Sequence, residues 1–124
     1  MAASLNDSTA IFLQIAQKIE DDILEQRIAE GEQVPSTNQF ATFYQINPAT
    51  AAKGINLLVD EGILFKKRGI GMFVAEGARS KLMMKRKQSF YDEFVIPLIK
   101  ESQKIGISIP ELIQMIDRKE GDES

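Results

Sequence analysis

Two helix starts lie close together in residues 35–75, and no other feature of the chain restricts its fold as strongly. Ser36 and Gln39 form the S-x-x-Q pattern of a capping box, in which the two residues satisfy each other's free backbone donors at the start of a helix. Asn47 and Pro48 form a second start, because an Asn side chain caps a helix and a proline fits its first turn without losing a hydrogen bond. The sequence therefore predicts two helices separated by a tight turn.

Further signals add a helix before this pair and a hairpin after it. Apolar residues recur at helical spacing over about 9–28, and the two capped helices are expected at 36–44 and 48–61. The apolar runs 63–65 and 72–74 flank a loop with two glycines, which is typical of a β-hairpin. This order of elements, mainly α with a small β-hairpin, is that of a winged helix-turn-helix, a fold that reads DNA.

The distribution of charge supports this interpretation, although the net charge is −3. Residues 66–87 hold eight basic side chains and one acidic side chain, while residues 1–62 and 88–124 are net acidic. A basic hairpin suits DNA, because an arginine at its tip fits the negative potential of a minor groove and neighbouring lysines meet phosphates. The plainer alternative is a solvated basic loop that has no partner.

The third helix carries a polar stripe near its start. Thr50, Lys53 and Asn56 fall on one face, and their hydroxyl, ammonium and amide groups suit phosphate and base-edge contacts in a major groove. A solvated helix face is the alternative reading. Small residues on the same helix permit close approach of a groove or a neighbouring helix, and we expect Gly54 to serve helix packing.

The side-chain inventory argues against an enzyme. The chain has no Cys and no His, which excludes thiolate chemistry, thiolate zinc sites and imidazole catalysis, and we expect no cofactor and no metal. Adjacent carboxylates at 21–22 and 60–61 are better explained as solvated helix faces. No secretion signal and no run of roughly 18 apolar residues is present, so a cytoplasmic location is expected.

Two more helices are expected in the last third of the chain. Apolar residues over 78–104 predict a long helix kinked at Pro97, and a second S-x-x-E pattern at Ser108 predicts a short helix that ends near Arg118. The predicted organisation is a winged helix-turn-helix DNA-binding domain at 1–76, a helical dimerisation region at 77–119 and a flexible tail at 120–124.

These last helices are too small to enclose a core, so their apolar faces need another surface. A second copy of the same region would provide it, and packing onto the chain's own winged domain is the alternative. The candidate dimerisation residues are Leu82, Phe90, Phe94, Leu98, Ile99, Leu112, Ile113 and Ile116.

Several motifs follow one another in a specific order over about residues 11–74. They are Leu13-Gln14-Ile15-Ala16, Pro35-Ser36, Asn47-Pro48-Ala49-Thr50, Leu58-Val59-Asp60-Glu61-Gly62-Ile63-Leu64 and Arg68-Gly69-Ile70-Gly71-Met72-Phe73-Val74. In this order they resemble the DNA-binding domain of the GntR family of bacterial transcription regulators. The Asn-Pro-x-Thr opening of the third helix and the short helical tail resemble the YtrA-like branch, whose members have a small dimerisation region and no large effector domain.

The resemblance implies DNA-contacting roles for Ser36, Thr50 and the wing pair Arg68-Gly69. Many members carry Arg where this chain has Asn38, Pro48 and Ala52, so that Lys53 and the wing would carry more of the affinity, with modest specificity or more readout of DNA shape. The candidate DNA-binding residues are Ser36, Thr37, Asn38, Asn47, Ala49, Thr50, Lys53, Lys66, Lys67, Arg68 and Gly69.

The sequence thus predicts a homodimeric transcription regulator that binds double-stranded DNA at a palindromic operator. Repression is the expected mode, with activation as an open alternative, and the resemblance implies a neighbouring transporter operon as target. A small-molecule effector would bind in a crevice between the tail and the winged domain. The rival hypothesis is a protein-interaction adaptor that keeps a winged helix but binds DNA weakly and without sequence preference.

Overall fold

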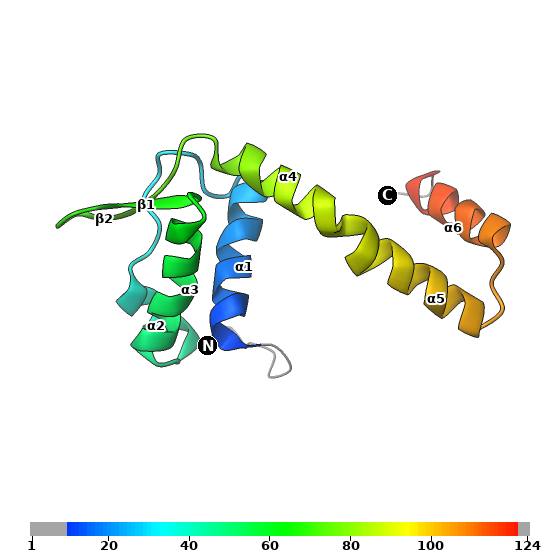
Figure 1. Ribbon diagram of the computed structural model, residues 1–124, viewed down its shortest axis with the longest axis horizontal. Coiled ribbons are helices and arrows are strands. Elements are labelled where there is room, and N and C mark those ends of the chain that lie inside the picture. Colours follow the sequence, from blue (N-terminus) through cyan, green and yellow to red (C-terminus); the bar gives the residue numbers. More distant parts are fainter. Residues whose placement is uncertain (1–9, 122–124) are drawn as a thin grey trace. The chain divides into compact units, whose positions relative to one another are not determined.

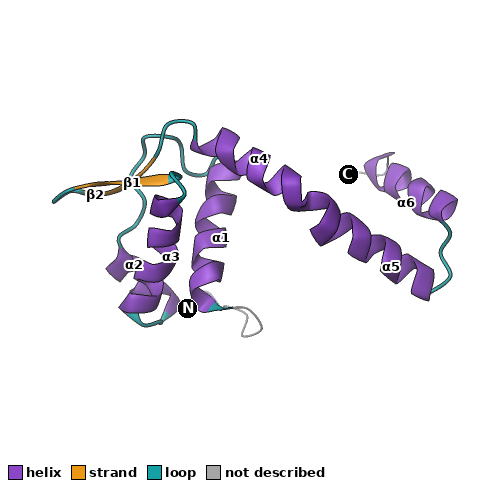
Figure 2. Cartoon of the chain, viewed as in Figure 1, coloured by secondary structure: helices purple, strands orange, loops and turns teal. Residues whose placement is uncertain are grey.

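The computed structural model describes residues 10–121, with side chains through residue 118. The elements in chain order are α1 (Ile11–Leu24), α2 (Thr37–Tyr44), α3 (Pro48–Asp60), β1 (Leu64–Lys67), β2 (Gly71–Val74), α4 (Ala78–Phe90), a π-helical turn (Tyr91–Val95), α5 (Ile96–Lys104) and α6 (Ile109–Gly121) (Figures 1 and 2). The predicted fold class, mainly α with a small β-hairpin, is confirmed.

The chain divides into two compact units between Met84 and Lys85. Ala78 and Leu82, on the first turns of α4, are fully buried in the core of the first unit. The sequence predicted the domain boundary at residues 76–77. Helical periodicity shows that a residue is buried, but it does not show against which part of the chain the residue packs. Leu82, which the sequence assigned to dimerisation, is accordingly part of the winged domain's own core.

The two predicted caps form as expected. Ser36 Oγ accepts from Gln39 N at 3.1 Å while Gln39 Oε1 accepts from Ser36 N at 2.7 Å, which completes the capping box of α2. Asn47 Oδ1 accepts from Ala49 N at 2.7 Å at the start of α3. These caps fix where both helices begin, so the turn between them, with Gln45 in the left-handed region, is defined by local chemistry.

Helix α1 is shorter than the predicted 9–28, and residue 9 lies outside the described part. After Leu24 the chain turns through Gln26, whose φ is 63°, and Asp22 O accepts from the backbone N–H groups of Arg27 and Ile28. Ile28 still packs against the core from this loop. Because Ile28 is apolar and reaches the core from a turn, it continued the helical pattern of the sequence beyond the end of the helix.

Helices α1 and α3 approach each other closely at Gly54. A Cβ added there would lie 2.5 Å from Phe12 O and 3.1 Å from Ile15 Cβ, so that the expected packing role of Gly54 is confirmed. The core beside this contact is made of fully buried aliphatic side chains from α1, α3, β1 and β2, chiefly Ile15, Ile19, Ile23, Ile55, Leu58, Leu64 and Val74.

The hairpin is joined by a third segment that the sequence did not reveal. Strands β1 and β2 pair antiparallel from Leu64 opposite Val74 to Lys67 opposite Gly71. On the other edge of β2, Gly31 N donates to Val74 O at 2.8 Å and Val34 N donates to Met72 O at 2.9 Å. Residues 31–34 thus tie the wing to the chain that leads into α2.

The second unit is helical throughout its elements. Instead of a simple kink at Pro97, a π-helical turn at Tyr91–Val95 precedes α5, whose first turn contains the proline. Pro97 has no N–H for the ordinary helical bond to residue 93, and the wider turn accommodates this loss. The capping pattern before α6 is confirmed, because Ser108 N donates to Glu111 Oε1 at 3.0 Å and Glu111 N donates to Ser108 Oγ at 3.3 Å.

Helix α6 runs to Gly121, beyond the predicted end at Arg118, so that residues 120 and 121 of the expected flexible tail are helical. Residues 122–124 of that tail lie outside the described residues. None of the helices among residues 10–121 is both long and apolar enough to span a membrane. Within the same residues, no group of three or more His, Cys, Asp or Glu side chains is placed to hold a metal ion.

Candidate nucleic-acid interface

All predicted DNA-binding residues lie in the first unit, on α2, on α3 and its cap, and on the hairpin. Thr37 and Thr50 are half-buried and the other nine are exposed. A polar surface that is open to solvent is the minimum requirement for contact with a duplex, and the predicted set meets it.

The start of α3 presents a polar face, and α1 adds a contact to it. Lys53 and Asn56 are exposed, one turn apart, beyond the half-buried Thr50. Lys53 Nζ lies 4.1 Å from the centre of the Phe12 ring on α1. This cation–π contact orients the ammonium group, and sequence spacing alone did not reveal it because the two residues are far apart in the chain.

The start of α2 offers hydrogen-bonding groups that are already ordered. Ser36 uses its backbone N–H and its oxygen lone pair in the capping box, and its hydroxyl hydrogen is left to donate. Asn38 is exposed on the first turn of α2. Donors at a helix start suit a phosphate, because the helix dipole adds positive potential there.

The wing separates its three predicted cations. Lys66 and Lys67 lie within β1 and point to opposite faces, because side chains alternate along a strand. Lys67 shares its face with a stacked aromatic pair, and its Nζ lies 4.6 Å from the centre of the Phe73 ring. Arg68 is the only one of the three in the turn itself, which Ile70 N closes by donating to Lys67 O at 2.9 Å.

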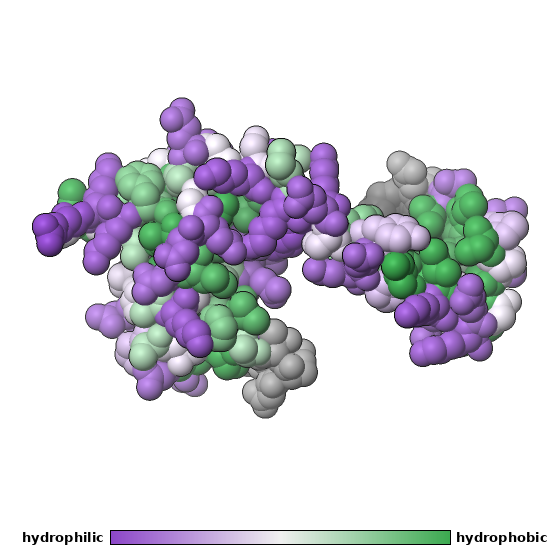
Figure 3. Space-filling model, in the orientation of Figure 1, coloured by the Kyte–Doolittle hydropathy of each residue, from purple (hydrophilic) through white to green (hydrophobic). Residues whose placement is uncertain are grey.

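Hydrophilic side chains gather over this hairpin and neighbouring surface in Figure 3. Not all of the basic segment 66–87 contributes to the wing, however. Arg79 is held near the start of α4, where its Nε donates to Leu24 O at 3.0 Å. Arg79 is therefore engaged near α4, and the charge count of segment 66–87 overstates the number of cations on the wing itself.

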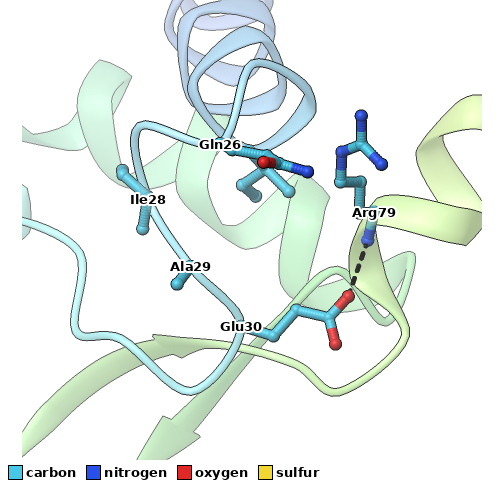
Figure 4. A pocket seen from close by; sticks show the side chains of 6 residues that line it. Gln26, Ile28, Ala29, Glu30 and Arg79 are labelled. Atoms are coloured by element: carbon cyan, nitrogen blue, oxygen red, sulfur yellow. Dashed lines mark hydrogen bonds between the residues drawn. The ribbon is translucent and has the colours of Figure 1, made fainter.

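A pocket of about 350 Å³ lies in the first unit between the end of α1 and the start of α4 (Figure 4). Glu30 closes one side, and its carboxylate accepts from Gly77 N at 2.9 Å and from Arg79 N at 3.3 Å. These backbone bonds hold the pKa of Glu30 below its ordinary value. The remaining lining residues are Ile23, Gln26, Ile28, Ala29 and Arg79.

Sequence reasoning missed two residues that organise this unit, Glu30 and Gln33. Glu30 caps the start of α4 from a loop far away in sequence. Gln33 Nε2 donates to Ile70 O in the wing turn at 3.0 Å. Neither lies in a capping motif or a periodic pattern, so the sequence contains no local signal for either contact.

A capped helix-turn-helix with an exposed polar recognition face and a basic hairpin defines a winged helix-turn-helix DNA-binding protein. The model of the bacterial regulatory proteins of the GntR family matches residues 12–74. Among curated proteins, the HTH-type transcriptional repressor YtrA of Bacillus subtilis is 30% identical over 109 residues, which cover 88% of this chain and 83% of YtrA. The chain belongs to the GntR family, and the resemblance to its YtrA-like branch is confirmed.

Solved structures agree with this assignment. A transcriptional regulator of the GntR family from Bacteroides thetaiotaomicron is 34% identical, with a TM-score of 0.72 over 93% of this chain and 100% of that chain. The DNA-binding domain of AraR, solved in complex with operator ORX1, shares the fold at 24% identity and a TM-score of 0.54, over 60% of this chain and 96% of that one. The protein is a DNA-binding transcription regulator of this family, which is not a family of enzymes.

Proposed function

We propose that the protein is a homodimeric transcriptional repressor that binds a palindromic operator, and that it acts in the cytoplasm, where it blocks RNA polymerase. The observation that carries the proposal is that the two units present different kinds of surface. The first presents the polar face of α3 and the basic wing, and the second leaves large apolar side chains exposed. A two-fold axis through the second unit would bring two recognition helices to two half-sites.

The dimer part of the proposal is supported by exposure in the second unit. Side chains of Phe90, Phe94, Leu98, Ile113 and Ile116 are 44–61% exposed, and green apolar surface is visible on this unit in Figure 3. Ile99 is half-buried and Leu112 is only 8% exposed, so these two contribute to the unit's own packing. The proposed contact set therefore keeps the five exposed residues and omits Leu82, Ile99 and Leu112.

For DNA, we infer that Thr50 and Lys53 enter the major groove while Arg68 reaches the minor groove. Ser36, Thr37, Asn38, Asn47, Ala49, Lys66, Lys67 and Gly69 complete the proposed contact set. The repressor YtrA and the operator complex of AraR support this use of the fold. Control of a neighbouring transporter operon is part of the same proposal.

A small-molecule effector remains a prediction, and we place it in the pocket beside Arg79 shown in Figure 4. The Arg79 guanidinium suits a carboxylate and the Glu30 carboxylate suits an ammonium group, so a small zwitterion fits the two charges, while Ile23 and Ile28 offer apolar walls. Titration with small amino acids, followed by NMR at the Arg79 side chain, tests this placement.

The decisive experiment is binding to promoter DNA of the protein's own gene and to random DNA over a salt series. The proposal predicts a preference of at least about a thousandfold for one palindromic site. Thr50→Ala should lower discrimination by about 1–3 kcal/mol for each half-site, and Arg68→Ala should reduce the salt slope by about two, because the dimer loses one contact in each half-site. Lys104→Ala, an exposed lysine of the second unit, is the matched charge control and should leave both unchanged.

The rival function is an adaptor that binds another protein through its second unit. Its support is that Asn38, Pro48 and Ala52 stand where many family members carry Arg. If all DNA binds weakly and the variants Thr50→Ala, Lys53→Ala and Arg68→Ala behave like Lys104→Ala, the repressor is excluded and the adaptor becomes the preferred hypothesis.

A further inference from the structure

The wing turn is tied by one side chain to a segment that precedes it in the chain by more than 30 residues. Gln33 Nε2 donates to Ile70 O at 3.0 Å, across a sequence separation of 37. Within the turn, the bond from Ile70 N to Lys67 O closes the hairpin locally. The Gln33 bond is thus a second, non-local restraint on the same residue, Ile70.

The position of Gln33 is itself fixed by the backbone on both sides. Its main chain forms an isolated bridge with Phe73, and the next residue donates from Val34 N to Met72 O at 2.9 Å. Backbone pairing therefore aims the Gln33 side chain along the hairpin toward its turn, which lowers the entropy lost when the amide bonds Ile70.

Gly71 provides the space that this side chain occupies. A Cβ added at Gly71 would collide with Gln33 Nε2, and the φ of 147° at this position favours glycine as well. The hairpin thus lacks a side chain at the place where the amide crosses it. The space at Gly71 thus accommodates the amide in the position from which it bonds Ile70.

Gln33 also lines a cleft of about 390 Å³ between the start of α2 and the wing. Ser36 and Gln39 form the helix side of the cleft, and Ile70 and Met72 form the wing side. The restraint therefore connects the two parts of the proposed interface that approach the DNA backbone.

We propose that Gln33 is a positioning residue for DNA binding, which holds the turn Arg68–Ile70 at a fixed place relative to the start of α2. The inference rests on the proposed function of the wing. A turn that is ordered before binding loses less entropy on the duplex, so loss of the restraint should weaken binding by roughly three- to tenfold. Gln33 carries no charge, and its effect would be exerted through Arg68.

The test compares Gln33→Met with Gln17→Met, a matched change at an exposed glutamine of α1. Methionine keeps the length of the side chain but cannot donate a hydrogen bond. Each change is combined with Arg68→Ala, and the dissociation constant is measured on the best available DNA site over a salt series. The amide heteronuclear NOE of residues 68–70 is measured on the free protein in parallel.

If Gln33 has a positioning role, Gln33→Met should weaken DNA binding and lower the salt slope although no charge is removed. The factor by which Arg68→Ala raises the dissociation constant should be at least threefold smaller in the Gln33→Met background than in the wild type. The NOE of the turn should fall in Gln33→Met and not in Gln17→Met. If the effects of Gln33→Met and Arg68→Ala on the binding free energy are additive, or if the salt slope is unchanged, Gln33 either contacts DNA directly or makes no contribution. Either result would overturn the inference. If the protein does not bind DNA specifically, the NOE of residues 68–70 still tests the restraint. An unchanged NOE in Gln33→Met would show that Gln33 does not order the turn. A lowered NOE would show that it does, and only the proposed function would then be wrong.

Discussion

At the scale of single residues, the contact between α1 and α3 depends on the absence of a side chain at Gly54. In a helix, alanine is ordinarily favoured over glycine by about 1 kcal/mol. Here the added Cβ would lie 2.5 Å from Phe12 O, a backbone atom that cannot rotate away. We therefore expect Gly54→Ala to lower the free energy of unfolding by about 1–2 kcal/mol, because overpacking outweighs the helix propensity.

Urea denaturation measures this change, and Asn56→Ala on the same helix is the control. Asn56 is exposed, so its replacement by alanine should raise stability by a few tenths of a kcal/mol, roughly the difference in helix propensity. A Gly54→Ala protein that is more stable than the wild type would show that the two helices separate easily, contrary to the close contact described above.

At the scale of elements, the start of α4 is held by the Glu30 carboxylate, which accepts from Gly77 N and Arg79 N. These bonds lower the pKa of Glu30 from its ordinary value of 4.5 in the folded state. A carboxylate of lowered pKa stabilises the fold above the unfolded-state value, and this contribution is lost as the pH falls through the folded-state value. Wild type should thus exceed Glu30→Gln in stability at pH 7, and the difference should shrink below about pH 4.5.

Urea midpoints of the two proteins at pH 7 and in the acid range check this expectation. Glutamine keeps one acceptor oxygen, so Glu30→Gln removes the charge together with one of the two backbone hydrogen bonds, and the contribution of the charge is the part of the stability difference that depends on pH. Glu76→Gln, at an exposed carboxylate of the turn before α4, is the control and should show no such narrowing. A stability difference that is independent of pH would mean that the hydrogen bonds act without help from the charge.

The elements themselves divide into those that local sequence specifies and those that it does not. Helices α2, α3 and α6 were predicted because their caps are formed by residues only two or three positions apart. The segment 31–34 was not predicted as a strand partner, because its bonds to Val74 and Met72 use backbone groups that any sequence provides. The wing was predicted as a hairpin, but the division of its cations between strand and turn depends on register.

The same distinction applies to the candidate site. Nine of the eleven predicted DNA-binding residues are exposed, as their sequence pattern indicated, whereas the contact of Lys53 with Phe12 and the hydrogen bond from Gln33 to Ile70 in the wing turn join distant parts of the chain. For Leu82, the sequence correctly indicated a buried apolar residue, but it did not show that the residue packs in the core of the winged domain. A single sequence does not show which residues from distant segments become neighbours in the folded chain.

At the scale of the whole molecule, the proposed dimer explains why a regulator would expose Phe94 to 61% and Phe90 to 55% in one compact unit. The centres of the two rings are 5.5 Å apart, so the two exposed side chains lie next to each other. Exposed apolar surface of this kind marks an interaction site in soluble proteins. Burying it against a second copy would remove it from water and would double the number of recognition helices on one DNA molecule.

Phe94→Glu should therefore convert the protein from dimer to monomer in sedimentation equilibrium, since two carboxylates would be brought together in an apolar interface. The circular dichroism spectrum should not change, because Phe94 is largely exposed in the single chain. Operator affinity should fall by at least about a hundredfold, because a monomer loses the gain in effective concentration that a linked second half-site provides. Leu13→Glu, on exposed α1 surface, controls for an added carboxylate and should remain dimeric. A monomeric wild type, or a dimeric Phe94→Glu protein, would contradict the proposed interface, and a monomeric wild type would favour the packing of the tail onto its own winged domain.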